Sequence, residues 1–378
     1  MRGYLALGFV LAMASCQPDL DRPSPPPPFA KRHETQISAI SMPPVVLVPP
    51  APLAQSSTRW TFAVMSDLHL PNYKTPTVTR TVAALVALHP RLVVITGDHT
   101  NGSGLGPRPG HKLDLWWQAV TGALQPLRDA GIPVLPVAGN HDSYLLGQRE
   151  GYAAAFADLK AWAAPLEVEQ PAGNILSVAH APFSYSVDID DVHLSLTHVV
   201  AQRLDKDVAT WLAADLAAAS GAKHRIVFGH VPMSSVIQPP SQTFVSRFGA
   251  ILAAGHAEMY VAGHEHLVWD EDVELPGGAL LRQILVGCTS GFYDFAPNDA
   301  SRKRADCVPT VRAGRREPQL CKMPHGGGEF ELSRGRKNRQ IQHYKNSFTL
   351  FTVDGETITA RPMTIDDAGN VRPFYLNE

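Results

Sequence analysis

The sequence has few cysteines, no long apolar segment and no marked excess of either charge. Its 378 residues include four cysteines, whose spacing matches neither a zinc ribbon nor a dense disulfide framework. The apolar run at 4–13 is too short to span a bilayer as a helix of a mature protein. The formal net charge of −2 predicts no general affinity for nucleic acid.

The composition is typical of a globular protein, with 44% apolar and 18% charged residues. The length is sufficient for one to three domains. Histidine is the unusual component. The chain contains 16 histidines, and histidine is a common ligand of transition metals.

Residues 1–16 have the pattern of an export signal. Arg2 precedes the apolar run, and the end of the segment, Met13-Ala14-Ser15-Cys16, resembles a bacterial lipobox. We expect export to the bacterial periplasm or cell surface and a membrane anchor through a lipid on Cys16, with cleavage as an ordinary secretory signal as the alternative. Residues 17–57 are rich in proline and are predicted to be an extended linker. A folded domain is expected at 58–378.

Five short clusters of polar residues each follow an apolar run. In chain order they are Asp67-x-His69, Gly97-Asp98, Gly139-Asn140-His141-Asp142, Gly229-His230 and Gly263-His264-Glu265-His266. The runs at 60–65, 92–96 and 134–138 alternate with helical patterns at 77–88 and 112–130, which predicts parallel strands. Further strands are expected in a hairpin at 185–197 and at 225–228 and 258–262. Ligands collect at the carboxyl ends of such strands.

The clusters offer oxygen and imidazole ligands and no thiolate. This choice of ligands suits Zn, Mn, Fe or Ni held for hydrolysis better than a structural zinc site. The order of the motifs over roughly 59–269 resembles the calcineurin-like metallophosphoesterase superfamily. That superfamily includes purple acid phosphatases, protein phosphatases and cyclic-nucleotide phosphodiesterases.

The expected fold is α/β, a four-layer α/β/β/α sandwich of two mixed sheets with flanking helices. Strand-like runs at 279–286, 347–353 and 357–362 suggest a second sheet packed on the first. The resemblance implies the same architecture. Residues 298–346 show no clear periodicity, contain more Lys and Arg than Asp and Glu, and are predicted to be a long basic loop inserted in the domain.

The resemblance also implies a site for two divalent or mixed-valence metal ions. One ion would be held by Asp67, His69 and His266, the other by Asn140, His230 and His264, and Asp98 would bridge them. Two such ions activate a hydroxide that attacks phosphorus in line. His141 matches the family histidine that faces the leaving oxygen, as a general acid or a stabiliser of the transition state.

The expected function is metal-dependent hydrolysis of a phosphate ester, either a monoester or a diester. The alternative is a catalytically inactive, surface-tethered binding lipoprotein with the same fold. No specific nucleic acid partner is expected. In an oxidising compartment Cys307 and Cys321 are candidates for a disulfide, with Cys288 buried and free, although pairing of Cys288 with either of them is the alternative.

Overall fold

The computed structural model describes residues 51–56, 58–72, 74–102, 113–169, 178–291, 296–309, 319–323, 325, 329–334, 340–342 and 346–374. The predicted signal segment with Cys16 and most of the predicted linker lie outside the described residues. Within the described ranges, no helix has both the length and the apolar character needed to cross a membrane.

One sheet joins the beginning of the domain to its end. Its strands are β1 (Arg59–Met65), β2 (Val93–Ile95), β3 (Val134–Pro136), β14 (Phe348–Asp354), β15 (Thr357–Ile365) and β16 (Val371–Pro373). Their order is β16-β15-β14-β1-β2-β3. The strands β1, β2 and β3 are parallel, as the sequence predicted, whereas β14 pairs with β1 in the antiparallel direction.

The middle of the chain forms the second sheet. Its strands are β4 (Tyr185–Ile189), β5 (Val192–Leu196), β6 (His224–Phe228), β7 (Met259–Ala262), β8 (Val268–Glu274) and β9 (Leu280–Val286). Their order is β4-β5-β6-β7-β9-β8. The four inner strands are parallel, and β4 and β8 are antiparallel edge strands. Both sheets are therefore mixed.

The runs at 279–286, 347–353 and 357–362 were predicted to form one second sheet, and this partition is wrong. The first run is β9 and lies in the second sheet, whereas the other two are β14 and β15 in the first sheet. The β14–β15 hairpin covers the edge of β1 that β2 leaves unpaired, which removes an exposed strand edge. Such pairing joins segments far apart in the chain, so no local pattern contains it.

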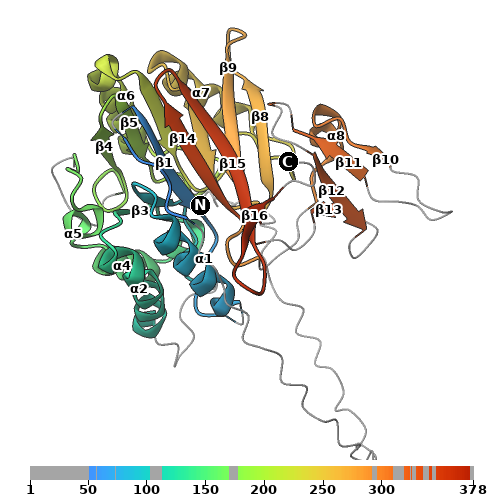
Figure 1. Ribbon diagram of the computed structural model, residues 1–378. Coiled ribbons are helices and arrows are strands. Elements are labelled where there is room, and N and C mark those ends of the chain that lie inside the picture. The colour runs from blue at the N-terminus through green and yellow to red at the C-terminus, as the bar shows by residue number, and fades with distance from the viewer. Residues whose placement is uncertain are drawn as a thin grey trace, which may run out of the picture. The chain divides into compact units, whose positions relative to one another are not determined.

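Helices cover the outer face of each sheet, which gives four layers (Figure 1). Along the first sheet lie α1 (Thr75–Leu88), α2 (Leu113–Asp129), α4 (Leu146–Ala155) and, beside β3, α5 (Leu159–Ala163). Along the second sheet lie α6 (Lys206–Ala218), followed by the short helix η1 (Ala219–Gly221), and α7 (Gln242–Ala254). The predicted α/β/β/α sandwich is confirmed.

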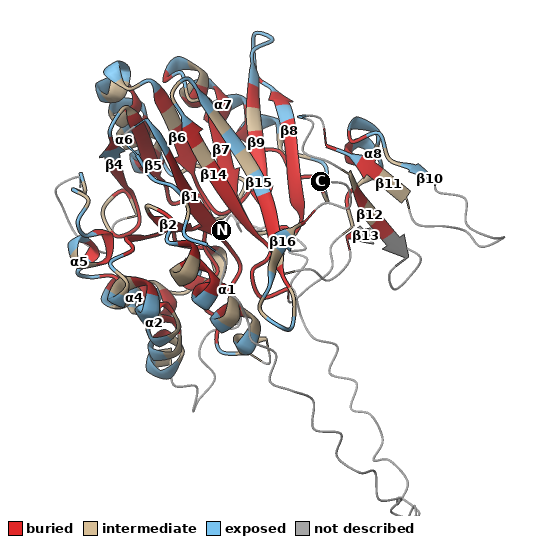
Figure 2. Ribbon diagram, viewed as in Figure 1, coloured by how far each residue is buried: buried red, intermediate tan, exposed pale blue. Residues whose placement is uncertain are grey.

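Alternating side chains of the strands fill the interfaces between layers, and most residues of the two large sheets are buried, apart from β16 and the first part of β15 (Figure 2). Along β1, Phe62 and Val64 belong to the cluster between the two sheets, where Phe62 stacks on Phe351. Ala63 and Met65 belong to the cluster under the helices of the first sheet. A third cluster lies under α6 and α7. The core therefore fixes both sheets relative to each other.

Residues 298–346 were predicted to be a loop, and this prediction is wrong for the described part of the segment. It contains α8 (Asp299–Arg304) and an antiparallel sheet of β10 (Val308–Pro309), β11 (Gln319–Lys322), β12 (Glu329–Arg334) and β13 (Gln340–Gln342). Phe330 and Leu332 alternate with charged residues along β12 and are buried in the cluster of the second sheet. The alternation is too short to identify a strand from sequence.

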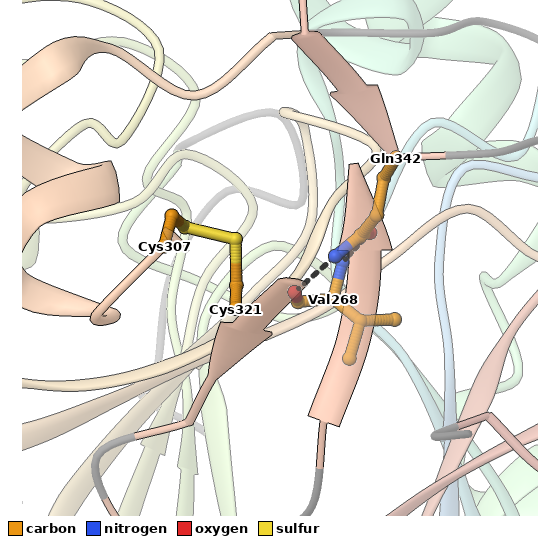
Figure 3. Close-up of a disulfide and its surroundings, with 4 residues drawn as sticks. All are labelled: Val268, Cys307, Cys321 and Gln342. Atoms are coloured by element: carbon orange, nitrogen blue, oxygen red, sulfur yellow. Dashed lines mark hydrogen bonds between the residues drawn. A yellow bond between two sulfur atoms is a disulfide. The ribbon is translucent and has the colours of Figure 1, made fainter. Parts of the chain in front are cut away.

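A disulfide joins two residues within this insertion, and one side chain of the insertion forms hydrogen bonds with the backbone of β8 (Figure 3). Cys307 and Cys321 are bonded to each other, and Cys288 is buried and belongs to no disulfide. The side-chain amide of Gln342 accepts a hydrogen bond from Val268 N at 2.8 Å and donates one to Val268 O at 2.9 Å. Gln342 thereby substitutes for a strand partner at the edge of the second sheet.

A buried histidine links the β4–β5 hairpin to α6. His193 Nδ1 lies 2.7 Å from Asp188 Oδ1, and His193 Nε2 lies 3.0 Å from Asp215 Oδ2. Burial lowers the pKa of His193, but the hydrogen bonds and charges of Asp215 and Asp188 outweigh burial and raise it above its ordinary value. The protonated ring therefore stabilises the folded state.

We expect His193→Asn to lower the free energy of unfolding by roughly 1–3 kcal/mol at pH 6 and by less at pH 9. Because folding raises the pKa of His193, the stabilisation by the protonated ring is fully present below the pKa of the unfolded chain, about 6.5. It is lost as the pH rises through the pKa that His193 has in the folded state. Urea denaturation at both pH values measures the difference, with the exposed His256→Asn as control. An equal loss at both pH values would show that the ring acts through packing alone.

Candidate metal centre

Every predicted ligand follows closely on the carboxyl end of a strand. The ligand segments follow β1, β2, β3, β6 and β7. The segment after β3 leads into the short helix α3 (Asn140–Ser143), which contains Asn140 and His141. Parallel strands from both sheets thus bring the loops to one place. The side chains that meet there are Asp67, His69, Asp98, Asn140, His141, His230, His264 and His266.

Five of these residues have a left-handed backbone conformation. They are Asp67, His69, Asp98, His264 and His266, with φ between 49° and 68°. Such a conformation costs a non-glycine residue roughly 1–3 kcal/mol and is concentrated at functional sites. Five of the nine non-glycine residues with positive φ in the described part of the chain are thus candidate ligands, and this concentration supports a functional site at this position.

Glycine is required where the ligand loops approach one another. A Cβ atom on Gly139 would collide with the backbone and carboxylate of Asp98, and one on Gly263 would collide with Ser66 and Asp67. Each glycine therefore allows a loop of one strand to contact the ligand loop of another.

Asp67, His69 and His266 form the first group of converging atoms. His266 Nε2 lies 3.1 Å from Asp67 Oδ1 and 3.2 Å from His69 Nε2. Asp67 Oδ2 accepts hydrogen bonds from the Ser66 hydroxyl at 2.6 Å and from the backbone N–H of His264 at 3.0 Å. These bonds orient Oδ1 toward the two imidazoles.

The second group converges on His230 Nε2. This atom lies 3.0 Å from Asn140 Oδ1, 3.2 Å from Asp98 Oδ2 and 3.3 Å from His264 Nδ1. The other nitrogen of His230 donates to the carbonyl of Thr96 at 2.7 Å. That hydrogen bond fixes the ring and directs Nε2 into the group.

Asp98 lies between the two groups. Its Oδ2 is 3.2 Å from His230 Nε2 and 3.9 Å from His69 Nε2, so one carboxylate reaches both. Its Oδ1 accepts a hydrogen bond from the backbone N–H of His141 at 2.8 Å. A bridging ligand would occupy this position.

His141 lies at the accessible edge of the site. Its side chain is 21% exposed, whereas that of Asp98 is 3% exposed, and its Nε2 lies 3.8 Å from Asp98 Oδ2. Its Nδ1 donates a hydrogen bond to the carbonyl of Gly102. With Nδ1 held in this way, Nε2 faces the centre.

Burial and the neighbouring charges shift the pKa values of the groups in the site. Burial raises the pKa of Asp98, but the charges of His230 and His141 outweigh burial and hold it well below its usual range. Burial lowers the pKa of His230, but Asp98 raises it to about 9. Burial and the charge of His230 lower the pKa of His264 to about 3. A bound cation would supply the same charge and release the proton of His230.

The donor set fits metal ions. Donor atoms lie within 4.8 Å of one another in each of three overlapping groups, Asp67–His69–His266, His69–Asp98–His141 and Asp98–His230–His264. Imidazole nitrogens and carboxylate oxygens suit Zn, Mn, Fe or Ni. No cysteine belongs to these groups in the described part of the chain. The clusters suggest a binuclear site and do not select one metal.

Behind the ligands, Asp142 joins two of the loops. Its carboxylate accepts hydrogen bonds from the backbone N–H of Gly139 at 2.9 Å and of His99 at 3.1 Å, and it lies 2.9 Å from His99 Nδ1. The structure buries His99 fully, with its ring centroid 5.3 Å from that of Phe156. No local signal predicted this burial, because it depends on α4 and the residues after it.

A family model described as calcineurin-like phosphoesterase matches residues 61–268, more than half of the chain. No curated protein sequence matches. Solved structures with a similar fold include GAP50, the anchor in the inner membrane complex of Plasmodium, with 11% identity over 85% of this chain and 90% of that chain and a TM-score of 0.46. They also include PhoD, with 12% identity over 82% and 73% and a TM-score of 0.46. A dimetal phosphatase from Danio rerio shows 11% identity over 78% and 99% and a TM-score of 0.42. On the match to the family model, the chain belongs to the calcineurin-like phosphoesterase family.

Proposed function

We propose that the chain hydrolyses phosphate esters with two metal ions held between its two sheets. The observation that carries this proposal is the position of Asp98, which lies within 4 Å of imidazoles from both ligand groups. Two bound metal ions would polarise the phosphoryl oxygens and lower the pKa of an attacking water. The proposed ligands are Asp67, His69 and His266 for one ion and Asn140, His230 and His264 for the other, with Asp98 shared.

The remaining residues would prepare the site for a leaving group. Gly102 holds His141 through Nδ1, so a second proton would reside on Nε2, which faces the centre. From there it can pass to the leaving oxygen of an ester. Asn140 supplies a neutral oxygen and thereby limits the negative charge of the ligand set.

Two nitrophenyl esters test the proposal. The protein would be treated with a chelator, supplied with Mn, Zn, Ni or Fe, and assayed with nitrophenyl phosphate and bis-nitrophenyl phosphate. Metal-dependent release of nitrophenolate supports the proposal, and the preferred ester separates monoesterase from diesterase. Metal binding without turnover of either ester would favour the inactive binding lipoprotein.

We also propose that the protein is exported and anchored to a membrane through Cys16. The support is the pattern of residues 1–16, in which an apolar run ends at a lipobox-like cysteine. The proline-rich segment 17–57 would hold the domain away from the membrane surface. Substrates would then be phosphate esters outside the cytoplasm.

Cys16→Ser is expected to move the protein from the membrane fraction to the soluble periplasm or the medium. A serine at this position cannot carry the lipid, and the described residues contain no membrane-spanning helix. Fractionation of cells that express each form measures the shift, with Cys288→Ser as a control that leaves the signal unchanged. Equal membrane association of the Cys16→Ser and wild-type proteins would leave plain secretion as the explanation.

A further inference from the structure

A polar loop of the second sheet supports the first ligand group from behind. Residues 287–291, Gly-Cys-Thr-Ser-Gly, follow β9 and contact the end of β1. Thr289 N donates to Ser66 O at 2.8 Å, and Thr289 Oγ1 accepts from Ser66 N at 3.1 Å. The hydroxyl of Thr289 donates to Ser347 O at 2.9 Å. The loop therefore connects the two sheets directly beside the candidate metal centre.

The same loop holds the strained backbone of Asp67. The thiol of Cys288 donates to the Asp67 carbonyl at 3.3 Å, and the hydroxyl of Ser290 donates to the same oxygen at 3.0 Å. Asp67 has a φ of 55°, which L-residues rarely adopt. Two hydrogen bonds on its carbonyl oppose relaxation of this conformation. Both donors are almost fully buried, at 2% and 1% exposure.

Cys288 also lies close to His266, a ligand that follows β7 of the second sheet. Asp67, in contrast, belongs to the loop after β1 of the first sheet. The 3.1 Å separation of Asp67 Oδ1 and His266 Nε2 therefore spans the junction that Cys288 and Ser290 support. Outer partners of this kind orient metal ligands and fix their distance.

We propose that Cys288 and Ser290 are positioning residues of the metal centre, which hold Asp67 and His266 in the geometry that a metal ion requires. The proposal rests on the proposed metal-binding function. Neither residue belongs to the converging ligand groups, so both act through the ligands. A hydrogen-bond donor is needed at each position, and alanine supplies none.

Cobalt(II) binding to the full chain tests this role, because the visible spectrum of cobalt reports ligand geometry without catalysis. We expect the Cys288→Ala/Ser290→Ala double variant to bind cobalt roughly 10–100-fold more weakly and to show an altered spectrum. Ser290→Ala alone should give a smaller loss in the same direction. Cys288→Ser, which keeps a donor, should retain wild-type affinity and spectrum.

Ser186→Ala is the matched control, because Ser186 is also buried and donates to Asp215 in the second sheet. Unfolding temperatures measured with a chelator report stability apart from metal binding. Wild-type affinity and spectrum in the double variant would overturn the proposal, and so would a cobalt loss that Ser186→Ala shares. If the wild-type chain bound no cobalt, the metal centre itself would be refuted, and this proposal with it.

Discussion

Asp98→Asn is expected to remove at least one metal ion per chain and to slow phosphate-ester hydrolysis by more than about 10²-fold. Loss of an outer partner of a ligand costs roughly 10–100-fold in metal affinity or activity, and a ligand shared by two ions should cost more. Asparagine has the same shape and tolerates the left-handed backbone at φ 51°. The substitution therefore removes the shared charge and leaves the loop conformation intact.

Elemental analysis of the purified protein and kcat/KM measured with excess metal would give both quantities. Asp272→Asn on β8 is the matched control, since its side chain is 39% exposed and interacts with His325 away from the ligand groups. Two metals per chain and near-wild-type turnover in Asp98→Asn would contradict the bridging assignment. Lost metal with an unchanged unfolding temperature in chelator would support it.

The positions of the candidate ligands were predictable because each belongs to a local motif. A glycine, a polar ligand and a preceding apolar run occur within a few residues, and parallel strands bring such motifs together. Gly139 shows why the spacing is specific, because a side chain there would collide with Asp98. The sequence alone could thus predict which residues meet.

The residues that support the ligands were not predictable. Cys288 and its acceptor Asp67 are 221 residues apart, and His99 and Asp142 are 43 apart. A buried thiol and a histidine in a loop have no pattern that identifies their partners. Their roles arise only when the loop after β9 contacts the end of β1. They also require that α4 and the residue after it pack against the loop after β2.

The same distinction between local and distant information holds for the fold. Parallel β1, β2 and β3 with their helices follow from hydrophobic periodicity along one stretch of chain. The pairing of β14 with β1 joins Arg59 to Asp354, and a hydrophobic pattern cannot specify which sheet a distant strand will join. The inserted sheet was missed because its strands are short and the alternation of buried residues along them covers few positions.

The second large effect is expected at His141. Its side chain is 21% exposed, whereas those of His69, His230 and His266 are at most 3% exposed, and its Nε2 faces the centre. A residue that protonates a leaving group contributes about 10²–10⁴-fold to the rate. Because this contribution depends on the leaving group, ester chemistry can separate it from metal binding.

His141→Ala is therefore expected to slow hydrolysis of an alkyl phosphate by about 10²–10⁴-fold and to affect a nitrophenyl ester much less, because nitrophenolate departs without a proton. Metal content should remain that of the wild-type protein, since the proposed ligand set does not include His141. His325→Ala, which removes a partly exposed histidine of the insertion, is the matched control. Equal losses for the two esters would exclude the general-acid role, and a loss of metal would instead make His141 a ligand, as its 3.8 Å approach to Asp98 permits.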